Sequence, residues 1–198
     1  MSEPRRIGIF GGTFDPIHQT HIDIARAALA QGPLDSVLFV VAALPPHKRD
    51  EVAAAAEDRY DMVAAALAKE PGLEPSRIEI ERNGPSYTVD TLARLRADDP
   101  DSVFFLILGE DSLVDFPRWH APARILEFAS LLIVPRPESH ADTPQWIRDH
   151  CRYLHFAERA LSSTEVRERL RAGSKLDGVV PEAVQQIIRA RGLYRADC

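Results

Sequence analysis

Glycine and histidine residues near the amino terminus have the types and spacing of an anion-binding turn. Gly11 and Gly12 directly follow a short apolar run, and His18 and His21 come shortly afterwards, three residues apart. Glycines let the backbone turn sharply and approach a ligand, because no Cβ atom stands in the way. Histidines at this spacing share one face of a first helical turn. A strand, a glycine turn and a helix start together offer N–H groups and the positive end of the helix dipole to a phosphate.

Each part of this motif also has a simpler interpretation. A glycine pair is often only a tight turn, and two histidines can be buried and satisfied or form a surface pair. Zinc ligation by His18 and His21 is a third alternative, but no cysteine or further histidine lies nearby, so no metal-ligating residues are predicted. The order of strand, glycines, Thr13 and histidines is less expected by chance than any single part, and it favours a phosphate site.

Two polar stretches follow later apolar runs. Lys48 comes after Pro45 and Pro46, which hold the backbone extended, so it can present a cation near a strand end, although a solvated loop is the alternative. Ser86 and Thr88 lie in a Gly-Pro-Ser-Tyr-Thr stretch. This stretch is typical of a turn and a helix start, and Ser86 or Thr88 can simply cap that helix.

Three further stretches have both a structural and a functional interpretation. Asp111, after Gly109, can accept hydrogen bonds from sugar hydroxyls or simply begin a helix. Trp119 can be an ordinary core residue, but its polar neighbours favour an exposed indole that stacks on a flat ring. Ser162 and Thr164 precede a helix, and Arg167, one turn in, offers a fork to phosphate oxygens, with capping alone as the alternative.

The elements that must position these residues alternate between strand and helix. Apolar runs predict strands at residues 6–10, 36–43, 77–81, 103–108 and 130–134, with a short sixth at 153–156. Helical periodicity predicts helices at 20–30, 57–69, 88–97, 166–171 and 182–191. This alternation predicts an α/β fold, a doubly wound parallel sheet with helices on both faces. Such sheets bind ligands beyond the carboxyl ends of their strands, where the strand order switches.

Length and charge limit the remaining choices. The 198 residues predict a single domain over 1–198, with a helical part from about 160. There is no apolar run long enough for a membrane span and no room for a signal peptide, and two cysteines suit a reducing cytoplasm. A net charge of −6 argues against a nucleic-acid partner, while formation of a homo-oligomer stays open.

Taken in order, these stretches resemble the nucleotidylyltransferase superfamily with its Rossmann-like fold, and in particular the bacterial nicotinate-nucleotide adenylyltransferases. Residues 11–18 with His21 look like the signature whose core is His-x-Gly-His, although Thr20 stands where the family has a glycine near adenine. Further similarities are Pro-Pro-His-Lys at 45–48, Pro-Ser-Tyr-Thr at 85–88 and Ser-x-Thr-x-x-Arg at 162–167.

The resemblance implies transfer of the adenylyl group of ATP to nicotinate mononucleotide, giving deamido-NAD and pyrophosphate. It implies catalytic roles for His18, His21, Lys48 and Arg167. The implied ATP site consists of Gly11, Gly12, Thr13, Phe14, His18, His21, Gly109, Asp111, Ser162, Thr164 and Arg167. The implied nicotinate mononucleotide site consists of Thr13, Lys48, Ser86, Tyr87, Thr88 and Trp119. Mg²⁺ is expected to arrive with ATP, keeping most of its waters, without a dedicated carboxylate cage.

Other activities compete with this expectation. A relative with the same fold acts on the amide, nicotinamide mononucleotide. Pantetheine-phosphate adenylyltransferase lacks the Pro-Ser-Tyr-Thr stretch and is disfavoured. A nucleotide-binding module without catalysis is supported only by Thr20, while His18, His21 and Arg167 argue against it.

Overall fold

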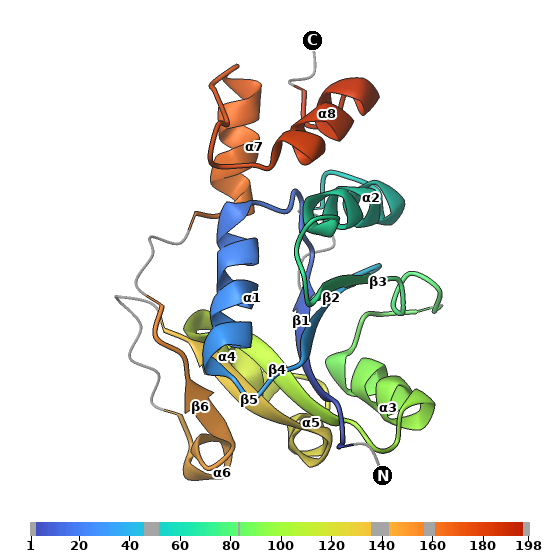
Figure 1. Ribbon diagram of the computed structural model, residues 1–198, viewed down its shortest axis with the longest axis vertical. Helices are drawn as coiled ribbons and strands as arrows, with labels where there is room; N and C mark the ends of the chain where they lie inside the picture. Colours follow the sequence, from blue (N-terminus) through green and yellow to red (C-terminus); the bar gives the residue numbers. More distant parts are fainter. Residues whose placement is uncertain (1–2, 46–51, 83, 136–142, 157–160, 196–198) are drawn as a thin grey trace.

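A six-stranded parallel sheet forms the centre of the protein in a computed structural model that describes residues 3–45, 52–82, 84–135, 143–156 and 161–195 (Figure 1). Its strands are β1 (Arg6–Gly12), β2 (Ser36–Val41), β3 (Leu73–Ser76), β4 (Val103–Gly109), β5 (Ala129–Val134) and β6 (Cys151–Tyr153). They lie in the order β3-β2-β1-β4-β5-β6, and each neighbouring pair is parallel. The order switches direction between β1 and β4, so the predicted doubly wound α/β fold is confirmed.

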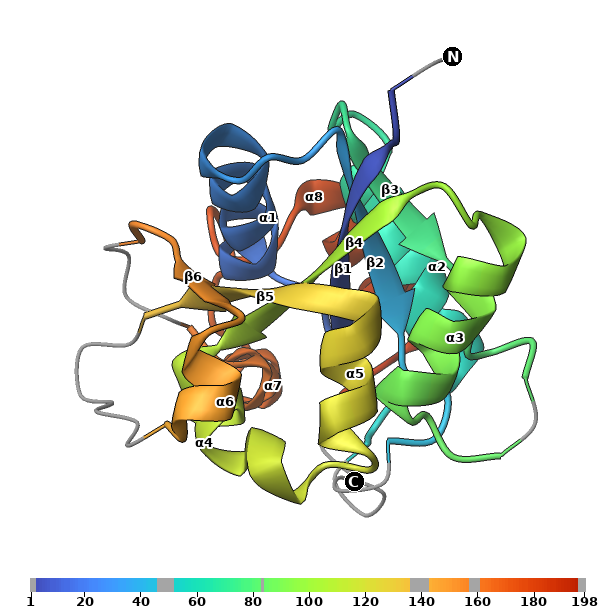
Figure 2. The same cartoon turned by 90° about the horizontal axis from the view of Figure 1, so that it is seen from below.

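Helices cover both faces of this sheet. They are α1 (Gln19–Gln31), α2 (Ala56–Leu67), α3 (Thr88–Asp98), α4 (Glu110–Asp115), α5 (Pro122–Phe128), α6 (Gln145–Arg148), α7 (Ser163–Arg171) and α8 (Glu182–Arg191), with a 3₁₀ turn η2 (Phe116–Arg118). Figure 2 shows α1 on one side of the sheet and α3 and α5 on the other. Within the described residues, no helix is long and apolar enough to cross a membrane.

Each face of the sheet carries its own hydrophobic core. Side chains from α1, α2, α7 and α8 form the first core, and side chains from α3, α4, α5 and α6 form the second. Successive residues of a strand point to opposite faces. Phe10 of β1 therefore lies in the first core and Ile9 in the second, and Leu132 and Leu131 of β5 divide in the same way.

The strand predicted at 77–81 is wrong. The third strand is Leu73–Ser76, and residues 78–80 form a turn. Alternating polar and apolar residues at 77–81 imitate a half-buried strand. Pro75, in contrast, argues against a strand at 73–76, where the strand actually lies. Proline is tolerated because β3 is an edge strand, paired only with β2 in the described sheet.

The remaining predictions differ mainly at element boundaries. The sixth strand spans Cys151–Tyr153 instead of 153–156, and α8 has the predicted bounds. Helices α4, α5 and α6 were not predicted, because elements of 6, 7 and 4 residues are too short to show a helical period. Helix α4 begins directly after β4, with Gly109 as its N-cap residue.

Candidate functional site

The loop from β1 to α1 lies beside the point where the strand order switches, and its two glycines have different roles. A Cβ atom on Gly11 would have no neighbour within 4 Å, so this backbone borders open space. A Cβ atom on Gly12 would lie 2.8 Å from the ring of Phe14. Gly11 therefore leaves room for a ligand, whereas Gly12 leaves room for an aromatic ring of the protein.

The side chain of Phe14 belongs to the core. The residue is 2 % exposed, and its ring packs against Phe10 and Phe39 at centroid distances of 5.7 and 5.5 Å. Its backbone is left-handed, with a φ of 50°, which is uncommon for a residue with a Cβ atom. A contact of Phe14 with a nucleotide would therefore go through its backbone, not its ring.

His18 and His21 lie together at the start of α1. His18 is the N-cap residue, and its backbone N–H donates to Nδ1 of His21 at 3.3 Å. The two ring centroids are 3.8 Å apart. Because Nδ1 of His21 accepts this bond, a neutral His21 carries its proton on Nε2. The predicted one-faced histidine pair is therefore present, and it also closes the amino end of the helix.

Burial keeps His18 neutral. The residue is 2 % exposed, and burial lowers the pKa of His18 to about 4, with the charge of Glu165 opposing the change. Its Nδ1 has no hydrogen-bond partner among the described residues. A buried polar atom without a partner is rare and suggests a group that a ligand completes. Thr20, two residues later, is also buried in the first turn of α1.

Arg59 is a residue of this site that the sequence motifs missed. It is 1 % exposed, and its Nη1 donates to the carbonyls of Thr13 and Ala42 at 2.7 Å each, while Nε donates to the carbonyl of Ala54 at 3.1 Å. The guanidinium therefore joins the chain beyond β1 to the chain beyond β2. A signal was present, because Arg59 shares the apolar face of α2 with Met62 and Val63.

The start of α7 docks on the same loop. The hydroxyl of Ser163 donates to the carbonyl of Pro16 at 3.1 Å, and Nη1 of Arg167 donates to the carbonyl of Asp15 at 2.8 Å. Nη2 of Arg167 donates to Oγ1 of Thr164 at 3.2 Å. The structure therefore brings Thr164 and Arg167 to the predicted phosphate loop, with part of the guanidinium fork already engaged by the protein.

Ser162 caps α7, as the alternative interpretation held. Its Oγ accepts from the N–H of Glu165 at 3.2 Å, and its own N–H donates to Oε2 of Glu165 at 2.9 Å. This reciprocal pair satisfies two donors at the helix start. Capping is thus confirmed for Ser162, and a further role in holding an anion stays a prediction.

Ser86 joins the end of β2 to the start of α3. Its Oγ accepts from the N–H groups of Ala43 and Leu44 at 3.0 and 3.2 Å, and its own N–H donates to the carbonyl of Leu44 at 3.0 Å. Tyr87 is the N-cap residue of α3, and Thr88 is the first residue of that helix. The predicted stretch therefore stands beside the chain that leaves β2. Lys48 follows on that chain and lies outside the described residues.

The indole of Trp119 is not the exposed platform that its neighbours suggested. It is half-buried, and its ring lies 5.4 Å from the buried ring of Phe116. Nearby, the half-buried ring of Tyr87 stacks on the exposed ring of His120 at a centroid distance of 4.4 Å. Trp119 packs on the second core because Phe116, three residues earlier in a 3₁₀ turn, faces that core.

Gly109 and Asp111 lie at the end of β4, across the strand-order switch from Gly11. Gly109 ends the strand and caps α4, and Asp111 is an exposed residue in the first turn of that helix. Across the described parts of the chain, no group of three or more His, Cys, Asp or Glu side chains is arranged to hold a metal ion. The carboxylates of this region therefore form no metal cage within those parts.

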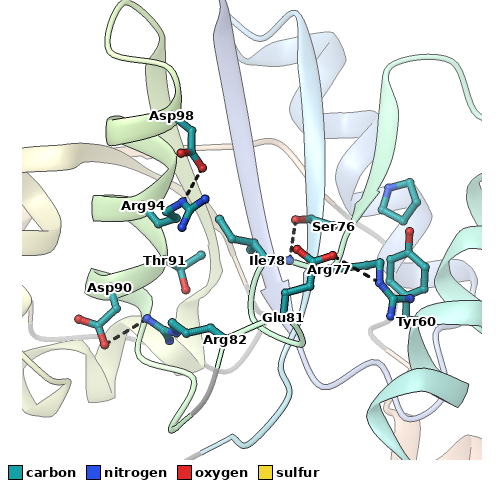
Figure 3. A pocket seen from close by; sticks show the side chains of 11 residues that line it. Tyr60, Ser76, Arg77, Ile78, Glu81, Arg82, Asp90, Thr91, Arg94 and Asp98 are labelled. Atoms are coloured by element: carbon teal, nitrogen blue, oxygen red, sulfur yellow. Dashed lines mark hydrogen bonds and ion pairs between the residues drawn. The ribbon is translucent and has the colours of Figure 1, made fainter.

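A hollow away from the loop between β1 and α1 lies between α2, α3 and residues 75–82. It has a volume of about 570 Å³, and its arginines face it from both sides (Figure 3). Each arginine is paired with a carboxylate: Arg77 with Glu57, Arg82 with Asp90 and Arg94 with Asp98. Its cationic charge is already neutralised, so we place the candidate phosphate site at the loop after β1.

Comparison with known proteins gives consistent results. Residues 9–169 match the cytidylyltransferase-like family. A probable nicotinate-nucleotide adenylyltransferase of Saccharopolyspora erythraea is 41 % identical over 100 % of this chain and 93 % of its own. One from Thermus thermophilus is 44 % identical over 96 % and 100 %. The solved Plasmodium falciparum nicotinic acid mononucleotide adenylyltransferase complexed with NaAD has the same fold, with a TM-score of 0.77 and 18 % identity over 96 % of this chain and 97 % of its own.

The buried His18 predicts a specific acid sensitivity. Its folded pKa of about 4 lies below its unfolded value of 6.5, so the unfolded state binds more protons between these pH values. Stability from the neutral ring is therefore complete above pH 6.5 and is lost as the pH falls toward 4. Between about pH 7 and pH 5, the free energy of unfolding should fall by about 2 kcal/mol more in the wild type than in His18→Gln. Urea titrations at both pH values measure this, and equal losses in the two proteins would refute it.

Adding a methyl group at Gly11 and at Gly12 should affect the free energy of unfolding to different extents. Gly12→Ala should lower the free energy of unfolding by about 1–3 kcal/mol, because its Cβ atom meets the confined ring of Phe14. Gly11→Ala should change stability by less than about 0.5 kcal/mol, because its Cβ atom points into open space. Thermal melting of the two variants makes each the control for the other, and similar melting temperatures would contradict the assignment.

Proposed function

We propose which residues of this chain carry out adenylyl transfer. The premise is that the chain belongs to the cytidylyltransferase-like family and, within it, to the nicotinate-nucleotide adenylyltransferases. The chain is an enzyme that transfers the adenylyl group of ATP to nicotinate mononucleotide, giving deamido-NAD and pyrophosphate. One observation supports these roles above all. Gly11, His18 and the docked Arg167 lie around the end of β1, where the strand order switches.

The chemistry needs no nucleophile from the protein. A phosphate oxygen of nicotinate mononucleotide attacks the α-phosphorus of ATP in line and forms the new P–O bond. The bond from that phosphorus to the oxygen bridging to the β-phosphate breaks, and pyrophosphate leaves with the electron pair. Because the attacking phosphate is already an anion, the protein contributes positioning and stabilisation of charge.

His18 contributes a hydrogen bond instead of a positive charge. With a pKa of about 4, its ring is neutral near neutral pH, and a neutral imidazole has one N–H to donate. A donor that is preorganised in a buried site stabilises the growing charge on the α-phosphate more than a solvated one. His21, whose Nδ1 is engaged by the backbone of His18, presents Nε2–H to the ATP phosphates.

Positive charge in the site is proposed to come from Arg167 and Lys48. Arg167 is fixed by the carbonyl of Asp15 and by Thr164, so its remaining N–H groups are preorganised for ATP phosphates. Lys48 is proposed to neutralise the phosphate of nicotinate mononucleotide. The proposed ATP contacts further include the backbone of residues 11–14, Gly109, Asp111 and the α7 start at Ser162.

A divalent metal ion accompanies the nucleotide in this class of enzyme. We propose Mg²⁺, which binds substrate phosphates through one or two ligands and keeps several waters. When bound, the ion would neutralise phosphate charge, while the residues above hold the two substrates in line.

The nicotinate ring is proposed to bind near Ser86, Tyr87, Thr88 and Trp119. Helix α3 begins at Thr88, so N–H groups of its first turn and its dipole suit a carboxylate. A carboxylate only accepts hydrogen bonds, whereas a carboxamide brings two N–H donors of its own. Donors from the backbone therefore favour the acid.

A cytoplasmic location, a single domain over 1–198 and the oligomeric state stay predictions.

The activity itself is tested by substrate choice. The purified chain is expected to use ATP with nicotinate mononucleotide, and its specificity constant for the acid should exceed that for the amide by about a hundredfold or more, as two charge-assisted hydrogen bonds allow. Pantetheine phosphate should not react. Comparable use of acid and amide would refute the acid assignment and leave adenylyl transfer standing.

Trp119 should leave this preference intact. Both pyridine rings are flat and similar in size, so contact with the indole cannot separate them. Trp119→Ala is expected to raise the Michaelis constants for acid and amide by similar factors. The measurement is the ratio of the two specificity constants, on protein whose folding is checked by thermal melting. A change in this ratio of more than about threefold would contradict the prediction.

Arg167 should be sensitive to a conservative replacement. Lysine is a point charge and cannot hold Asp15, Thr164 and a phosphate with one planar fork. Arg167→Lys is expected to lower the specificity constant for ATP at least about tenfold, as loss of a hydrogen bond to a charged group implies. Arg169→Lys, on the exposed side of the same helix, is the matched control. Equal effects of the two changes would show that Arg167 holds no phosphate.

A further inference from the structure

Tyr194 is a buried tyrosine that the reaction outlined above does not use. It follows α8, is 8 % exposed, and adopts a left-handed backbone with a φ of 62°. Its hydroxyl donates to Oδ1 of Asp15 at 2.7 Å, across 179 positions of sequence. Burial raises the pKa of Tyr194, so the hydroxyl keeps its proton and remains a donor.

The carboxylate of Asp15 is the point where three parts of the chain meet. Besides Tyr194, it accepts from the N–H of Ala53 on Oδ2 at 2.7 Å and from the N–H of Ala54 on Oδ1 at 3.2 Å. Nη1 of Arg167 lies 3.9 Å from Oδ2. Asp15 is 2 % exposed, so these donors replace water around a buried charge.

Asp15 directly follows the strained part of the phosphate loop. Phe14, its neighbour, has the left-handed backbone conformation, which persists only when surrounding contacts enforce it. The backbone of Asp15 and Pro16 is already held by Arg167 and Ser163 of α7. Tyr194 adds the side-chain contact, from the turn that follows α8.

We propose that Tyr194 is a positioning residue for adenylyl transfer: by its hydrogen bond to the Asp15 carboxylate, it holds the loop of residues 11–15 in the shape that receives the ATP phosphates. Tyr194 touches no reacting atom in this scheme and acts through Asp15. The proposal rests on the proposed function and adds to it a dependence of ATP binding on the last described turn of the chain.

Removal of one oxygen atom tests the contact. Tyr194→Phe should raise the Michaelis constant for ATP about tenfold, the factor that corresponds to about 1.4 kcal/mol. The constant for nicotinate mononucleotide should change by a clearly smaller factor, because its proposed ring contacts lie at the start of α3. Tyr153→Phe, an exposed tyrosine on β6, is the matched control and should change neither constant.

A purely structural role would give a different result. Loss of folded enzyme lowers the maximal rate in proportion and leaves both Michaelis constants unchanged, and that outcome would overturn the proposal. So would a Tyr194→Phe protein identical to the wild type. Failure of the proposed function is separate, because the wild type itself would then not turn over ATP with nicotinate mononucleotide.

A double-mutant cycle tests whether Tyr194 acts through Asp15. In an Asp15→Asn background, Tyr194→Phe should raise the Michaelis constant for ATP less than about threefold, because residues that act through one contact are not additive. A full tenfold effect in that background would show that Tyr194 acts by another route and would overturn the proposal. If Asp15→Asn proves unstable, dissociation constants for a non-hydrolysable ATP analogue, measured on Tyr194→Phe and Tyr153→Phe, decide the question alone.

Discussion

The candidate site depends on the hydrogen bonds that the buried guanidinium of Arg59 donates to backbone carbonyls. A cation removed from water is strongly unfavourable unless acceptors and opposite charge replace the solvent. Here the acceptors are the carbonyls of Thr13, Ala42 and Ala54, and the charge of Asp15 assists. Because these carbonyls belong to the chain leaving β1, the chain leaving β2 and the approach to α2, one side chain fixes three segments relative to one another.

The same loop shows how a chain of net charge −6 can present a site for polyanions. Charge near the loop is gathered in Arg59 and Arg167, both held by backbone carbonyls, while burial keeps His18 neutral. The three arginines that line the hollow between α2, α3 and residues 75–82 are instead paired with carboxylates. Local placement, and not overall composition, therefore sets the sign of the field at the site.

Differences between prediction and structure arise where local patterns compete with tertiary packing. Residues 77–81 alternate like a strand, but β2 pairs instead with Leu73–Ser76, whose proline is harmless at an edge. Trp119 has polar neighbours in sequence, yet its ring packs on Phe116. Gly12 makes room for the ring of Phe14, a packing role that the sequence motif did not show, and its contact with ATP stays a prediction. In each case the pairing of a strand or the packing of a ring, and not the local sequence pattern, decided where the residues lie.

The sequence by itself determined the alternation of strands and helices, the doubly wound parallel sheet, the His18–His21 face and the motifs shared with nicotinate-nucleotide adenylyltransferases. These depend on periods and spacings within one segment, where sequence neighbours are also neighbours in space. Only the tertiary structure decided that Arg59 ties the strand ends together and that Tyr194 reaches Asp15. The low pKa of His18 also required it, because burial is a property of everything packed around a group, and no local pattern specifies that surrounding.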